Sequence, residues 1–390
     1  MNRRDALRNT MMWMAGSPLL RAQEVLGDTR DRFPAIDDLV NVFEFEPILK
    51  SKVPKNNYDF IAGGVDAEWT MRRNRESFDR ITFRPRFMRD VSKMDLSTEL
   101  FGQKISMPIL VAPTAGHQLA HEQGELATAR GAGQMKTIMA VSTNSSYPID
   151  KIGAAATGPL WFQLYVGPDW DGTRDRVERA VGAGCKAVCV TLDSAYGSHR
   201  ERLLRNRTSA GPVAVPSPGG RRGAAPREPL PYKLQSQFTA HLTWSFLDEI
   251  NKYAKVPVLL KGILTAEDAK LAVERGAAGI IVSNHGGRYL EYAPSTIEVL
   301  PEIVEAVGGR IPVLIDSGFR RGTDILKALA IGAKAVLIGR PPLWGLGAYG
   351  QAGVAKVLEL LQHELALSMG LAGATNLAAI DRKLVKIDAR

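Results

Sequence analysis

The feature that most constrains the fold is a repeat of short apolar segments that alternate with helix-like segments from about residue 105 onward. Near-continuous apolar runs of this length are typical of strands buried on both faces of a parallel sheet. We count eight such runs, and the alternation is not interrupted. The predicted strands are 105–115, 137–143, 159–166, 186–193, 256–263, 278–286, 311–318 and 333–341.

Eight strand–helix units predict a closed α/β barrel of the (β/α)8 TIM type and not an open doubly wound sheet. No GxGxxG motif is present, which also disfavours a dinucleotide-binding fold. Two helix starts are marked by Thr265 and Ser295, each a hydroxyl residue with an acidic residue three positions later. We expect both hydroxyls to cap their helices.

Two segments fall outside the repeat. Residues 30–104 predict an N-terminal helical extension that covers the bottom or a side of the barrel. The connection over about 198–240, after the fourth strand, is long and poor in apolar residues. Such a connection is usually a lid, a binding loop or partly disordered, and here it would overhang the carboxyl ends of the strands. We therefore expect a single barrel domain over 30–390.

The N-terminal segment 1–29 leaves the cellular location open. Arg3 and Arg4 precede a moderately apolar stretch, an arrangement that resembles a twin-arginine export signal. Gly16 and Pro18 interrupt that stretch, so a basic or disordered N-terminus on a cytoplasmic protein is the alternative. The stretch is too short to span a membrane. Cytoplasmic and periplasmic locations both stay open.

Composition and charge favour small anionic ligands over nucleic acid. The formal net charge is +9, but the basic residues do not form one block, and no nucleic-acid recognition motif accompanies them. Cys185 and Cys189 lie four residues apart in a strand-like run, too far to form a disulfide. No cluster of histidine, cysteine and carboxylate residues shows metal-ligand spacing.

The stretch SNHGGR places His285 and Arg288 at the end of the sixth predicted strand, around two glycines. One interpretation is a base and a carboxylate clamp held side by side, where the glycines let a flat ligand approach the backbone. The alternative is a buried histidine that a neighbouring residue satisfies. These six residues alone do not separate the two.

Polar residues at the other strand ends favour the functional interpretation. The carboxyl ends of barrel strands meet at one rim, where ligand sites of this fold are built. Glycine–arginine loops after the seventh and eighth strands are typical of phosphate sites. The rim candidates are Ser142, Gln163, Tyr165, Thr191, Asp193, Lys261, Ser283, His285, Arg288, Asp316, Gly318, Arg320, Gly339 and Arg340.

The stretches WFQLYV, GIIVSNHGGR and RRGTDILKALAIGAKAVLIGRP carry a resemblance to a known family. From Asn41 to Leu371 the chain resembles the FMN-dependent 2-hydroxy-acid oxidases and dehydrogenases, which include glycolate oxidase and L-lactate oxidase. The resemblance implies oxidation of an L-2-hydroxy acid to the 2-oxo acid. It also implies FMN as cofactor, reoxidation by oxygen or another acceptor, and a homo-oligomer, either a tetramer or an octamer.

On the substrate side, the resemblance implies that His285 is the active-site base and that Asp193 stabilises its protonated form. Arg288 and Arg200 would hold the substrate carboxylate. Tyr165 would point its hydroxyl at the substrate.

On the cofactor side, the resemblance implies that Lys261 stabilises the anionic reduced flavin from beside the N1/O2 edge. The residues expected around the isoalloxazine ring are Pro113, Thr114, Ala115, Ser142, Gln163, Thr191 and Ser283. Those expected around the ribityl chain and phosphate are Asp316, Gly318, Arg320, Gly339 and Arg340.

Three departures from the family pattern bear on the substrate. Phe60 stands where the family carries a second tyrosine for the carboxylate, and a lost hydrogen bond to a charged group costs roughly 1.5–3 kcal/mol. Small acids should bind poorly unless another group replaces that hydroxyl. Asn144 stands where glycolate oxidases often have a tryptophan, which predicts a wider pocket, and Ser317 replaces a glycine. An FMN-dependent isomerase and a non-enzymatic anion-binding barrel remain as alternatives.

Overall fold

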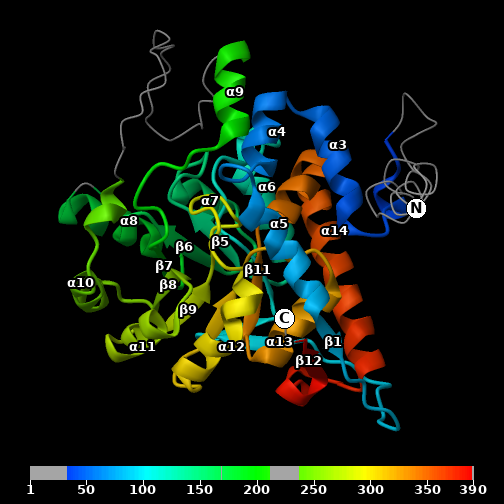
Figure 1. Cartoon of the computed structure of the whole chain (residues 1–390). Coiled ribbons are helices and arrows are strands. Elements are labelled where there is room, and N and C mark those ends of the chain that lie inside the picture. The colour runs from blue at the N-terminus through cyan, green and yellow to red at the C-terminus, as the bar shows by residue number, and fades with distance from the viewer. Residues whose placement is uncertain (1–32, 168, 211–236, 389–390) are drawn as a thin grey trace, which may run out of the picture.

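The computed structural model describes residues 33–167, 169–210 and 237–388 (Figure 1). The twin-arginine-like segment 1–29 and residues 211–236 of the predicted lid lie outside the described residues. Within the described ranges, no helix combines the length and the apolar character needed to cross a bilayer.

Eight parallel strands form a closed barrel, which confirms the predicted (β/α)8 fold. Each strand pairs with the next along the chain, and the last pairs with the first through Val336 and Ile109. In chain order the strands are β4 (Ile109–Val111), β5 (Met139–Ser142), β6 (Leu160–Leu164), β7 (Val188–Thr191), β8 (Val258–Ile263), β9 (Gly279–Val282), β10 (Val313–Ile315) and β11 (Ala335–Ile338).

Helices surround the barrel because nearly every strand residue is buried and needs apolar cover on its outer face. Thr265 caps its helix as predicted, since its hydroxyl accepts a hydrogen bond from the Asp268 amide at 3.2 Å. Ser295 does not, because its buried hydroxyl makes no cap bond and its carbonyl closes the first turn instead. The helices are α6 (Gly124–Gln134), α7 (Ile149–Ala155), α8 (Trp170–Gly182), α10 (Ser245–Tyr253), α11 (Ala266–Glu274), α12 (Thr296–Val307), α13 (Gly322–Ile331) and α14 (Arg340–Ala372).

A hairpin of β2 (Thr98–Leu100) and β3 (Gln103–Ile105) closes the amino-terminal end of the barrel. Leu100 and Ile105 join the cluster of side chains that fills the barrel interior. The Nε1 atom of Trp161, at the start of β6, donates to the Oε1 atom of Gln103 at 3.2 Å. The opposite end of the barrel is therefore the one available for ligands.

The rest of the N-terminal extension is helical, as predicted. It forms α3 (Phe45–Lys52), α4 (Lys55–Ala62) and α5 (Trp69–Glu76), and a short strand β1 (Ile81–Phe83) pairs with β12 (Val385–Ile387). The prediction that this extension covers the bottom or a side of the barrel was incomplete, because α4 also reaches the carboxyl ends of the strands. The reason is a set of hydrogen bonds from arginines on the rim to carbonyls at the end of α4.

The segment predicted as a lid begins with a helix, α9 (Glu201–Ala210), and not with a loop. This helix stands beside α4 (Figure 1). The Nδ2 atom of Asn206 donates to the Oδ2 atom of Asp59 at 2.6 Å, and Arg202 pairs with Glu68 at 2.5 Å. The described start of this segment is thus tied to the N-terminal extension at the carboxyl end of the barrel.

Candidate active site

A cavity of about 390 Å³ opens at the carboxyl ends of the barrel strands. Most of the residues that the sequence predicts for the site line it, and they come from all eight barrel strands or the loops after them, together with α4. These residues are Phe60, Pro113, Thr114, Ala115, Ser142, Asn144, Tyr165, Arg200, Lys261, His285, Arg288, Asp316, Gly318, Arg320, Gly339 and Arg340.

Four predicted residues do not line the cavity; three of them bond to residues that do, and Thr191 bonds to one of these three. Asp193 contacts His285, and Ser283 accepts a hydrogen bond from the Nζ atom of Lys261 at 2.7 Å. Gln163 accepts from the Ser142 hydroxyl at 3.1 Å. Thr191 accepts in turn from Gln163 at 2.9 Å, so the ends of β5, β6 and β7 share one chain of hydrogen bonds.

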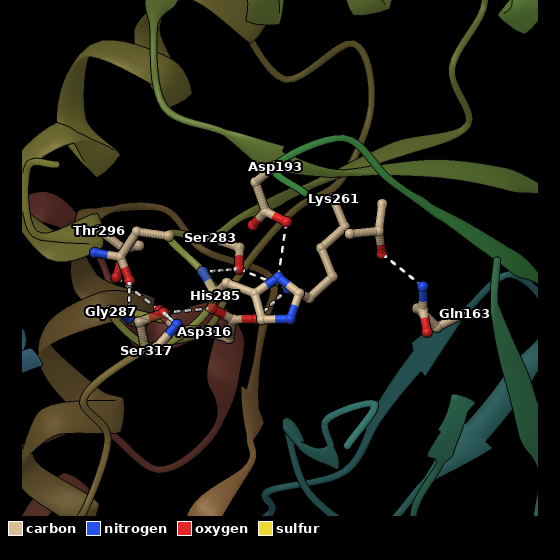
Figure 2. Close-up of polar contacts among 12 residues, drawn as sticks. Gln163, Asp193, Lys261, Ser283, His285, Gly287, Thr296, Asp316 and Ser317 are labelled. Carbon is tan, nitrogen blue, oxygen red and sulfur yellow. Dashed lines mark hydrogen bonds and ion pairs between the residues drawn. The ribbon is translucent and has the colours of Figure 1, made fainter. Parts of the chain in front are cut away.

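His285 and Asp193 form a partly buried pair (Figure 2). The Nδ1 atom of His285 lies 2.7 Å from the Oδ1 atom of Asp193. A carboxylate only accepts, so Nδ1 carries the proton and Nε2 keeps its lone pair. The Nε2 atom lies 3.4 Å from the Tyr165 hydroxyl. This arrangement leaves Nε2 as the ring nitrogen that can accept a proton.

The loop that carries His285 has an unusual backbone. His285 has a φ of 57° and the next two glycines have φ values of 67° and 71°. Asn284 anchors the turn through two hydrogen bonds with Asn74 of α5, at 2.9 and 2.8 Å. A Cβ atom on Gly287 would lie 2.6 Å from the Met71 nitrogen, so a glycine is required there.

The surroundings keep His285 neutral and Asp193 ionised. Burial lowers the pKa of His285 below its ordinary value of 6.5, with help from Lys261 and Arg288, although Asp193 acts in the opposite direction. Burial would raise the pKa of Asp193, but His285 and Lys261 lower it below its ordinary value. The imidazole is thus free to accept a proton near neutral pH.

Lys261 at the end of β8 is a buried cation. Its Nζ atom lies 3.1 Å from the Oδ2 atom of Asp316. Burial favours the neutral amine, but Asp316 and Asp193 raise the pKa of Lys261 above its ordinary value. Lys261 therefore brings a fixed positive charge to the cavity wall.

Arg200 and Arg288 form a cationic corner around Phe60. Their guanidinium carbons lie 5.5 and 5.2 Å from the centroid of the phenyl ring. Arg200 donates to Ser198, but its Nη1 atom is buried without a hydrogen-bond partner within the described ranges. Burial lowers the pKa of Arg288 well below its usual range, and the nearby Arg200 adds to the effect. The corner fits a small anion such as a carboxylate.

Arg320 and Arg340 form a second cationic group in the cavity wall, where Arg340 shares the Gly63 carbonyl with Arg288. Within the described part of the chain, their guanidinium groups donate only to carbonyl groups, and neither pairs with a carboxylate. Burial, and next the charge of Arg340, lowers the pKa of Arg320 to about 9. Burial lowers the pKa of Arg340 to about 10. Arg340 begins α14 and Arg320 lies just before α13, and two guanidinium groups at these helix starts suit a phosphate.

Sequence comparison decides which family this cavity belongs to. The sequence profile of the FMN-dependent dehydrogenases matches residues 49–387. The chain belongs to the FMN-dependent dehydrogenase family. It is 45% identical over 355 residues to glycolate oxidase 3 of Oryza sativa subsp. japonica, covering 90% of this chain and 97% of that protein. It is 43% identical over 356 residues to glycolate oxidase of Spinacia oleracea, covering 90% and 96%.

Solved structures agree with this membership of the FMN-dependent dehydrogenase family. Mandelate oxidase with 3,3-difluoro-2-hydroxy-3-phenylpropionic acid superimposes with a TM-score of 0.80 at 39% identity, covering 90% of this chain and all of that one. A soluble mutant of the membrane-associated (S)-mandelate dehydrogenase from Pseudomonas putida gives a TM-score of 0.82 at 35% identity, with the same coverage.

The cavity fits FMN, the cofactor of this family. FMN carries a phosphate and a flat ring, and the cavity offers the guanidinium groups of Arg320 and Arg340 and the buried cation of Lys261. Gly318 has a φ of 90°, and a Cβ atom there would lie 2.3 Å from the Asn74 carbonyl oxygen, so a glycine is required at this position. The three cationic groups suit a phosphorylated flat cofactor.

One residue of the cavity wall does not follow from the sequence pattern. Tyr289 lines the cavity beside His285, with ring centroids 4.7 Å apart and the planes at 71°. It belongs to no strand, so periodicity gives no sign of its direction. Its place directly after Arg288 is the signal that could have found it.

Proposed function

We propose that this protein uses FMN to oxidise an L-2-hydroxy acid to the corresponding 2-oxo acid. The observation that carries the proposal is the His285–Asp193 pair, because His285 and its Nε2 atom border a cavity with a cationic corner. A base beside a carboxylate-binding site is the arrangement that oxidation next to a carboxylate requires.

The substrate would bind at the cationic corner formed by Arg200 and Arg288. Arg200 and Arg288 hold the carboxylate, and the unpaired Nη1 atom of Arg200 gains a partner. The α-carbon then lies towards His285 and the Tyr165 hydroxyl, which are 3.4 Å apart. Water is kept from the reacting atoms by the N-terminal extension, because Phe60 and Ile61 line the cavity from above the strand ends.

The reaction removes two electrons and two protons from the substrate. His285 accepts one proton at Nε2, and Asp193 stabilises the imidazolium that results. FMN, when bound, would supply the acceptor for the two electrons and for the second proton. Lys261 stabilises the negative charge that develops beside it, and Arg320 and Arg340 hold the phosphate. The carbon–oxygen single bond of the alcohol becomes the carbonyl of the 2-oxo acid.

We propose that the cavity accepts substrates larger than glycolate. Ala115 and Asn144, two short side chains, line it. Each methylene of the substrate that is buried there adds roughly 0.8 kcal/mol to binding. We therefore propose a preference for longer aliphatic or aromatic 2-hydroxy acids.

Anaerobic titration of the purified yellow protein tests this function. We expect mandelate or 2-hydroxyoctanoate to bleach the flavin absorbance, with a higher kcat/KM than lactate or glycolate. Failure of all four acids to bleach it would overturn the proposal and favour isomerase chemistry on the same scaffold. A purified protein without flavin would favour the anion-binding barrel.

Reoxidation by oxygen or by another acceptor, and assembly into a homotetramer or octamer, are further parts of the proposal. They rest on the family resemblance. Oxygen consumption against reduction of an artificial dye would separate the acceptors, and light scattering of the eluting holoprotein would give the mass of the assembly.

A further inference from the structure

We infer that the Tyr289 hydroxyl binds the substrate carboxylate and supplies the hydrogen bond that Phe60 cannot make. The inference rests on the proposed function and adds a substrate-binding residue to it. Tyr289 follows Arg288 in the loop after β9 and is half-buried in the cavity wall.

The first argument is the direction in which the Tyr289 side chain points. The edge-to-face contact with the His285 ring, at 4.7 Å, turns the Tyr289 ring towards the cavity. The next two aromatic or apolar side chains of the same loop behave differently, since Leu290 and Tyr292 are both 71% exposed. The inward direction of Tyr289 is therefore particular to this residue.

The second argument is the set of polar side chains near the Tyr289 hydroxyl. Tyr289 and Tyr165 are the tyrosines among the described residues that line the cavity. Burial, and then the nearby Tyr289 hydroxyl, raises the pKa of Tyr165 well above its usual range. Both tyrosines also lie within electrostatic range of Arg200 and Arg288. Two neutral donors thus join two guanidinium groups at one corner.

The third argument is that Phe60 brings no hydrogen-bond donor to the corner. Its phenyl ring lies between the two guanidinium groups, 5.5 and 5.2 Å from them. A carboxylate held at this corner has more lone pairs than the arginines fill, because Arg288 already donates to the Gly63 carbonyl at 3.0 Å. Tyr289 lines the same cavity from the loop that carries Arg288, whereas Phe60 comes from α4.

Tyr289→Phe keeps the ring that packs on His285 and removes only the hydroxyl, so it is the variant to test. Oxalate, an unreactive carboxylate, would be titrated into the holoprotein and followed by the change in flavin absorbance. We expect the Kd for oxalate to rise about 10- to 100-fold, the size of one hydrogen bond to a charged group. Tyr292→Phe, on the same loop but outside the cavity, is the matched control and should leave the Kd unchanged.

Phe60→Tyr is the second variant of the experiment. If the two positions offer the same hydrogen bond, this change restores most of the affinity for oxalate in the Tyr289→Phe background and adds less in the wild type. An unchanged Kd in Tyr289→Phe, or a gain from Phe60→Tyr that is equal in both backgrounds, would overturn the inference. Because oxalate binding needs no turnover, this result is independent of whether a hydroxy acid bleaches the flavin, which tests the proposed function.

Discussion

Asp193, which follows β7, reaches His285, which follows β9, across the intervening strand β8, with 2.7 Å between the Oδ1 and Nδ1 atoms. The crossing is possible because β8 carries Gly262 at this height. A Cβ atom on that glycine would lie 2.9 Å from the Cβ atom of Asp193. The orientation of the base therefore depends on a residue that has no side chain.

We expect Gly262→Ala to slow flavin reduction and to destabilise the fold. Gly262 has a φ of 110°, which an alanine adopts at a cost of about 1–3 kcal/mol, and the new methyl group would displace Asp193. Stopped-flow reduction and urea unfolding of the holoprotein measure the two effects. Gly184→Ala is the matched control. This glycine also has a positive φ, 93°, but within the described part of the chain no atom lies within 4 Å of the place that a Cβ atom would take. Equal reduction rates in both variants would show that Asp193 keeps its place.

We expect Asp193→Asn to move the acid limb of the pH profile to lower pH. His285 must be neutral to accept a proton, so the rate of flavin reduction falls as the pH falls through its pKa. The Asp193 carboxylate raises that pKa against the effect of burial, and its removal lowers the pKa further. The weaker base should also slow the plateau rate by roughly 10²-fold or more. A limb that moves to higher pH would contradict this assignment.

We expect the His285→Gln variant to retain FMN. The rate at which the substrate reduces the flavin should fall about 10²- to 10⁴-fold relative to the wild type, the usual contribution of a general base. The amide keeps a polar group near Asp193 but accepts no proton at neutral pH. Flavin content by absorbance and single-turnover reduction under anaerobic conditions separate the two properties. A reduction rate near that of the wild type would remove His285 from the chemistry.

We expect Arg320→Ala to weaken FMN retention more than it changes the rate of the enzyme that still carries FMN. Arg320 is the sharper test because it donates to the carbonyl of the adjacent Phe319, whereas Arg340 also holds the end of α4 through Ile61 and Gly63. The measurement is flavin loss on dialysis. Arg310→Ala, whose bonds are to carbonyls of the preceding helix α12, is the control. Full flavin occupancy with lost turnover would place Arg320 in the substrate site instead.

Much of the fold follows from the sequence because its signals are local. An apolar run buried on both faces predicts a strand of a parallel sheet wherever it occurs, and eight such runs close a barrel. The rim candidates follow from the same logic, since topology alone brings the carboxyl ends of the strands together. Most of the predicted rim residues do line one cavity.

The sequence by itself thus determined the barrel, the end at which a site is built and the residue types gathered there. The tertiary structure decided which side chains face one another. In the structure α4 lies over the rim of the barrel, so Arg288 donates a hydrogen bond to the Gly63 carbonyl, which is 225 residues away in the sequence. Asp193 crosses β8 at Gly262, and Tyr289 points into the cavity whereas Tyr292 points into solvent. The physical reason is that side-chain direction in a loop depends on backbone angles and on contacts with distant segments, and neither has a period that a sequence pattern can carry.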